Sequence, residues 1–168
     1  AALNVSIKQR IREIEMNLER WRWLPSEFGE RHVIVNVPDY SLTVFEQGTP
    51  QFSMGVIVGK QYDDQATPIF TDTMEHLVFR PYWGIPHSIA VEEIVPEARR
   101  DLGYLARKNY QIVPDYHADT QPLATTAANL EKVARGDLRL REKPGPTNSL
   151  GLVKFIFPNQ YAVYLHDT

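Results

Sequence analysis

The chain has 168 residues, of which 43% are hydrophobic and 23% charged, and its formal net charge is −3. This composition is that of a globular domain with a core, and the absence of a basic run argues against nucleic acid as a partner. No apolar stretch approaches the roughly eighteen residues of a membrane span, so we expect no transmembrane segment. The sequence contains no cysteine, which excludes disulfides and thiolate metal sites within it.

An amphipathic helix is predicted near the N-terminus. Apolar residues recur there at spacings of three and four, at Ile7, Ile11, Ile14, Leu18 and Trp21. Leu24-Pro25 should end the helix, because a residue before proline is biased out of the helical region. We expect residues 1–28 to be an N-terminal helix and linker. The helix either braces the domain that follows or is the tail of a preceding one.

From His32 onward the apolar residues alternate, which predicts strands. The first is expected at 33–37, the second at 40–46 and the third at 52–58, with turns at 38–39 and 47–50. A fourth is expected at 74–80. The pattern favours an antiparallel meander with one buried face.

A helical block is predicted to follow. Residues 81–86 hold two prolines, a glycine and two aromatic residues, so we expect them to be irregular. Ser88 is a candidate N-cap, Pro96 should start a second helix, and a third should run over 125–135 and stop at Gly136. We interpret 81–137 as an insertion with too few large apolar residues for a core of its own.

The β pattern resumes after this block. Strands are expected at 138–141 and 152–157, and a turn at Pro158-Asn159 should lead into a last strand over 161–165. Residues 29–80 and 138–168 are therefore predicted to form one β core. The predicted fold class is mainly β with a helical insertion.

Few residue patterns point to chemistry. The five histidines lack helical metal-ligand spacing, so we expect neither a metal site nor a cofactor. Serine hydrolase signatures are absent as well. His166 stands out because it lies at the end of a predicted strand, where a histidine is either catalytic or structural.

Several motifs occur in one order along the chain. They are Thr67-Pro68, Pro81-Tyr82-Trp83, Asn148-x-Leu150-Gly151 and His166-Asp167-Thr168. With these motifs, residues 15–168 resemble the L,D-transpeptidases of bacterial cell-wall synthesis, and most closely the large Gram-negative subgroup with a helical capping insert.

The resemblance implies a β-sandwich core. It also implies a periplasmic enzyme that acts in peptidoglycan biosynthesis, contributes to cell shape and is a target of carbapenems. A cysteine would transfer an acyl group between stem peptides, forming 3→3 cross-links. His166 would be the catalytic base, and the backbone carbonyl of Asp167 would hold its tautomer. Arg141 is a candidate for binding a substrate carboxylate, and Tyr82 and Trp83 for a wall of the substrate groove. Each of these three has a structural alternative, a surface ion pair or core packing.

The chain departs from the resemblance at the nucleophile. In that family the cysteine lies in a Ser-His-Gly-Cys motif beyond the histidine, and none occurs here. We therefore expect a β core that is incomplete at its C-terminus, is inactive alone and has the remainder of the domain as its partner. The alternatives are a cysteine-free peptidoglycan-binding relative and a scaffold whose histidine is structural.

Overall fold

The computed structural model describes residues 5–59 and 66–167. The chain divides into two compact units, Ala1–Asp72 and Thr73–Thr168. Within the described ranges, no helix is both long and apolar enough to cross a bilayer.

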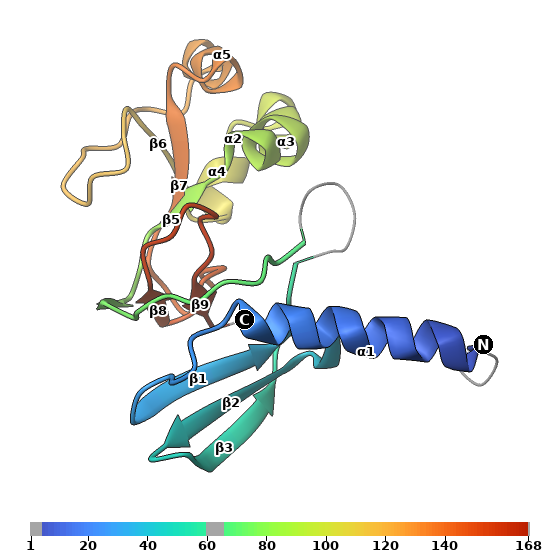
Figure 1. Cartoon of the computed structure of the whole chain (residues 1–168). Coiled ribbons are helices and arrows are strands. Elements are labelled where there is room, and N and C mark those ends of the chain that lie inside the picture. The colour runs from blue at the N-terminus through green and yellow to red at the C-terminus, as the bar shows by residue number, and fades with distance from the viewer. Residues whose placement is uncertain (1–4, 60–65, 168) are drawn as a thin grey trace. The chain divides into compact units, whose positions relative to one another are not determined.

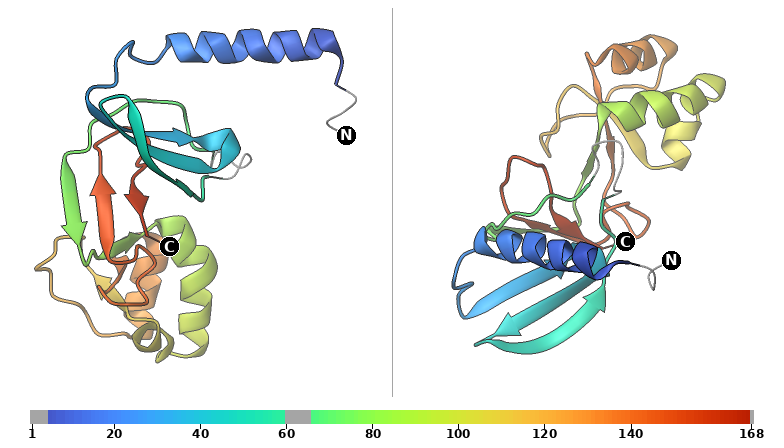
Figure 2. Two further views of the ribbon diagram at one scale, coloured as in Figure 1. Left: turned by 90° about the horizontal axis from the view of Figure 1, so that it is seen from below. Right: turned by 45° about the vertical axis from the view of Figure 1, so that its right-hand side comes forward.

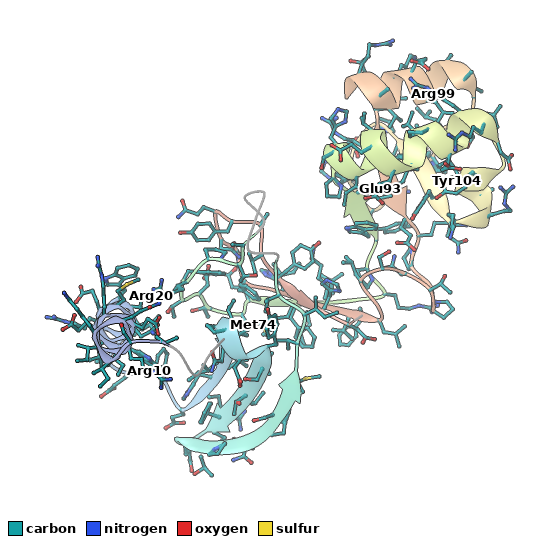
Figure 3. All side chains as sticks on the ribbon, turned by 90° about the vertical axis from the view of Figure 1, so that its right-hand side faces the viewer. Arg10, Arg20, Met74, Glu93, Arg99 and Tyr104 are labelled. Carbon is teal, nitrogen blue, oxygen red and sulfur yellow. The ribbon has the colours of Figure 1, made fainter. Side chains whose placement is uncertain are left out.

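The first unit begins with helix α1 (Ile7–Arg22), as predicted. The Ser6 hydroxyl accepts a hydrogen bond from the Gln9 backbone N–H and caps the helix. No residue of α1 is buried, and the predicted apolar stripe is exposed from Ile7 to Trp21. Figure 3 looks down this helix and shows its side chains radiating from the axis. Whether the helix braces the domain that follows or is the tail of a preceding one stays a prediction.

The predicted meander follows α1. Strands β1 (Arg31–Asn36), β2 (Ser41–Glu46) and β3 (Thr49–Gly55) pair antiparallel in that order (Figure 1). A 3₁₀ turn, Val37–Asp39, joins the first two strands, and Gln47 and Gly48, both with positive φ, join the next two. Leu42 is the only buried residue of these strands, so the expected buried face is largely open.

The second unit contains two further antiparallel sheets (Figure 2). One has the order β4-β8-β9, with bounds His76–Phe79, Val153–Ile156 and Leu165–His166. The other has the order β5-β7-β6, with bounds Trp83–Ile85, Arg139–Glu142 and Tyr110–Val113. Sequence reasoning expected β4, β7 and β8 but did not foresee β6.

Short helices connect the strands of the second sheet. They are α2 (His87–Ile89), the π-helical turn Ala90–Ile94, α3 (Val95–Arg100), α4 (Tyr104–Arg107) and α5 (Ala127–Arg135). Pro96 lies in the first turn of α3, as predicted. The predicted third helix is α5, which Thr126 caps and which Gly136 ends with φ +82°.

Three local predictions are wrong. Residues 81–86 are not wholly irregular, because Trp83–Ile85 form β5 between the two prolines, neither of which interrupts the ladder. Ser88 does not cap a helix, since α2 already begins at His87. The last strand spans only Leu165–His166. The Asn159 side chain hydrogen-bonds the backbone N–H groups of Tyr161 and Val163 and the Val163 carbonyl oxygen, so these groups do not pair with a neighbouring strand.

The predicted helical insertion has a core, contrary to expectation. The members of this buried cluster run from Ile85 to Leu140 and include Ile94, Leu105 and Leu130. Nine of the eleven members lie within 81–137, on β5, β6, the π-helical turn and α3–α5, and Leu138 and Leu140 add apolar partners from the segment that forms β7. The chain thus combines several small antiparallel sheets with a few helices. The division into a β-sandwich core and a cap stays a prediction.

Candidate functional site

His166 is held at the edge of the β4-β8-β9 sheet. In β9 it pairs directly opposite Lys154 of β8, and Leu165 pairs with Phe155. The imidazole is partly exposed, and its Nδ1 lies 2.5 Å from the backbone carbonyl oxygen of Asp167. Because a carbonyl oxygen can only accept, Nδ1 carries the proton in this contact and Nε2 keeps a free lone pair. This geometry suits a base that acts through Nε2.

The loop at 143–151 packs against the residue that holds this tautomer. Gly151 has φ +64°, and a β carbon at this position would lie 2.8 Å from Oδ2 of Asp167 and 2.9 Å from its Cγ. Only glycine combines this backbone with such a close approach. The glycine of the Asn-x-Leu-Gly motif, Gly151, therefore packs directly against Asp167.

The loop itself is fixed by two buried polar side chains. Asn148 donates to the Lys143 carbonyl oxygen at 2.9 Å and accepts from the Leu150 N–H at 2.8 Å. The buried Glu142 carboxylate accepts from the Ser149 N–H at 3.1 Å and from its hydroxyl at 2.7 Å. Buried polar groups satisfied in this way hold a loop in one conformation. The motif is thus a rigid support beneath Asp167.

Tyr164 links His166 to β8 and β5. The centroid of the Tyr164 ring lies 5.7 Å from that of the His166 ring. The Nζ of Lys154 lies 3.7 Å from the same Tyr164 centroid. Burial raises the pKa of Tyr164, while a hydrogen bond from the Trp83 side chain acts in the opposite direction. The indole N–H can only donate, so the Tyr164 hydroxyl accepts. Of the two predicted groove residues, Trp83 therefore reaches the histidine through Tyr164.

Arg141 is buried, and its guanidinium is engaged within the chain. It donates to Oε1 of Gln111 at 3.0 Å and to the backbone carbonyl oxygens of His117 and Thr120 at 2.9 and 2.8 Å. The guanidinium carbon also lies 4.2 Å from the centroid of the Tyr82 ring. These contacts support a structural role, in which Arg141 ties the 117–120 loop to β7. Carboxylate recognition by Arg141 stays a prediction.

Sequence reasoning missed Lys154 and Tyr164. The signal that could have found them is the alternation of 152–157, which places Lys154 on a face with Leu152 and Ile156, but the register against His166 depends on an irregular turn. Among the described residues, no three acidic or imidazole side chains gather as a metal site would require.

Comparison with known proteins supports the resemblance. Residues 30–168 match the L,D-transpeptidase catalytic domain (YkuD) family. A Haemophilus influenzae protein named "Putative L,D-transpeptidase" is 28% identical over 156 residues, which are 93% of this chain and 30% of that protein. The chain thus spans less than a third of the length of this relative. Because the family match covers most of its residues, the chain belongs to the L,D-transpeptidase catalytic-domain family.

Proposed function

We propose that this chain provides the catalytic base, His166, of an L,D-transpeptidase site. In such a site a thiol transfers an acyl group between peptidoglycan stem peptides in the periplasm. The observation that carries the proposal is the contact of His166 Nδ1 with the Asp167 carbonyl oxygen. It leaves Nε2 as a proton acceptor on a family-typical motif. No cofactor is required, because the reaction is an acyl exchange.

The first half of the reaction uses Nε2 as a base. Nε2 takes the proton of the thiol, and the thiolate attacks the carbonyl carbon on the L-centre of the third stem residue. The tetrahedral oxyanion collapses, the bond to the terminal D-alanine breaks, and the amine of D-alanine leaves with the proton from the imidazole. The product is a thioester.

The second half reverses these roles. Nε2 takes a proton from the side-chain amine of a diaminopimelate in a second stem, and the amine attacks the thioester. The thiol leaves with a proton, and a 3→3 cross-link has formed. Tyr82 and Trp83 are proposed to line the donor groove. Residues 81–137 are proposed to cap a β core made of 29–80 and 138–168. The buried cluster from Ile85 to Leu140 supports the proposal that the cap folds as one piece.

The thiol is not supplied by these 168 residues, which contain no cysteine. A second candidate is a cysteine-free relative that binds stem peptides without joining them. The two candidates share the histidine and differ only in whether the complete protein brings a thiol to it.

The test incubates the complete gene product with disaccharide-tetrapeptides and analyses the products by tandem mass spectrometry. The proposed function predicts a dimer whose fragments carry a diaminopimelate-to-diaminopimelate bond, and its loss when His166→Ala is introduced. Binding of the muropeptide without any dimer would establish the second candidate instead. A dimer formed at an unchanged rate by His166→Ala would overturn the role of the histidine.

A further inference from the structure

Lys154 lies beside His166 on the same face of the sheet. The two residues pair directly opposite each other in the antiparallel β8–β9 ladder, and side chains of such a pair project from the same face. The ammonium lies 3.7 Å from the centroid of the Tyr164 ring, whose other neighbour is the imidazole. The Tyr164 ring thus presents its face to the ammonium and lies next to the imidazole.

The charge of Lys154 has no carboxylate partner among the described residues. The ion pairs of the second unit involve other cations, such as Arg99 with Glu131 and Arg107 with Asp101. Lys154 is partly buried, and this burial lowers its pKa because the ammonium has lost part of its hydration. A ring face offsets some of that loss but accepts none of the three N–H groups as an oxygen would. The site therefore suits an incoming anion.

We propose that Lys154 binds the terminal carboxylate of the leaving D-alanine of the donor stem peptide. This inference rests on the proposed function and adds to it the residue that recognises the donor. The scissile carbonyl must lie close to the thiol that His166 deprotonates, and the D-alanine carboxylate is one residue further along, within about 3.8 Å per residue of chain. An ammonium on the ring next to His166 is placed for that carboxylate.

Arg141 is a weaker candidate for the same task. Its guanidinium already donates to three oxygens of the chain, and it is nearly fully buried. To bind a substrate carboxylate it would have to do so with its remaining N–H groups from within the protein. Lys154 has a partly exposed side chain and gives up no such contact.

The experiment compares two probes by titration of the ¹⁵N-labelled 168-residue chain, which needs no thiol. One probe is the tetrapeptide L-Ala-γ-D-Glu-diaminopimelate-D-Ala, and the other is the same peptide with its terminal carboxylate converted to an amide. We expect the wild type to bind the free acid about tenfold more tightly, as one charge-assisted contact in a partly hydrated site would give. Backbone amide shifts should map to β8 and β9.

The variants isolate the charge. Lys154→Met should bind both peptides with the same affinity, and Lys154→Arg should retain most of the preference. Lys132→Met, which removes an exposed ammonium from α5, should keep the tenfold ratio. Backbone spectra of Lys154→Met should match the wild type away from β8 and β9, because the change replaces a partly desolvated cation with an apolar chain of similar length.

The outcomes separate the two levels of the proposal. Equal binding of both peptides by the wild type, or a preference that survives in Lys154→Met, overturns the role of Lys154 and leaves the proposed function intact. A wild type whose dispersed amide spectrum shows a folded chain, and which binds neither peptide, contradicts both.

Discussion

Replacing Gly151 with alanine tests the support beneath Asp167. Adopting φ +64° costs a residue with a β carbon about 1 kcal/mol, and forcing that carbon to within 2.8 Å of Asp167 Oδ2 adds about 1–3 kcal/mol of overpacking. We therefore expect Gly151→Ala to lower the free energy of unfolding of the second unit by about 2–4 kcal/mol. The displaced Asp167 should also loosen the contact that fixes the tautomer of His166.

Two other glycines of the same unit serve as matched controls. Gly136 has φ +82° but only ordinary contacts, the nearest at 3.6 Å, so Gly136→Ala isolates the backbone cost of about 1 kcal/mol. Gly145 has neither a positive φ nor a neighbour within 4 Å, so Gly145→Ala should change stability by less than about 0.5 kcal/mol.

Urea unfolding followed by tryptophan fluorescence measures these differences. The exposed Trp21 and Trp23 are first replaced by phenylalanine, so that Trp83 alone reports on the second unit. The ¹⁵N shifts of the imidazole of His166 report the tautomer. If Gly151→Ala costs no more than Gly136→Ala and leaves those shifts unchanged, the close approach to Asp167 does not support the histidine.

Further predictions concern the rest of the second unit. Arg141→Met should lower the free energy of unfolding by about 3 kcal/mol, because it leaves the His117 and Thr120 carbonyl oxygens without their donor. Hydrogen exchange of the backbone amides at 115–120 should accelerate as well. Arg141→Lys should restore neither the stability nor the slow exchange. Thr126→Ala should cost about 1 kcal/mol by removing the acceptor of the Asn129 N–H, which melting experiments would detect. The preference for the free-acid peptide should be complete at neutral pH. As the pH rises, the preference should disappear before pH 10.5, because burial lowers the pKa of Lys154 and the ammonium loses its proton earlier than an exposed lysine would. A preference that persists above pH 10.5 would contradict the assignment. The 168-residue chain itself should show no mass increase after incubation with a carbapenem, since it has no thiol.

Local patterns were sufficient where the signal lies within one element. The stripe from Ile7 to Trp21 predicted α1, and the segment 125–135 with Gly136 as its stop predicted α5. Alternation predicted the β1-β2-β3 meander because its turns are short and its strands consecutive. These features depend on neighbours in sequence.

Long-range pairing explains most of what the sequence did not reveal. Strand β6 is short and is defined by its pairing with β7, and β5 is only three residues long. The buried cluster from Ile85 to Leu140 lies mostly inside the block, with Leu138 and Leu140 added from beyond it, and its members are spread over short elements that meet only in the fold, so counting large apolar residues along the sequence missed a core. The irregular segment held by Asn159 likewise shortened the last strand to Leu165–His166.

The candidate site shows the same contrast. His166 and the motif ending in Gly151 were recognisable as residue types in order, but the packing of Gly151 on Asp167 depends on two segments meeting in space. Lys154 reads as an ordinary strand residue until its register opposite His166 is known. The burial of Arg141 depends on Gln111 and on a loop near residue 120, which no local pattern connects to it.

The rate of thiol acylation in the complete gene product tests the role of His166 most directly. Stopped-flow fluorescence with a carbapenem measures this rate for the wild type, for His166→Ala and for His76→Ala, which removes an exposed histidine from β4 at the other edge of the same sheet. We expect His166→Ala to slow acylation by about 10²–10⁴-fold with its thermal melting unchanged, and His76→Ala to acylate at the wild-type rate. Equal rates for the wild type and His166→Ala would contradict the account and make His166 a structural residue.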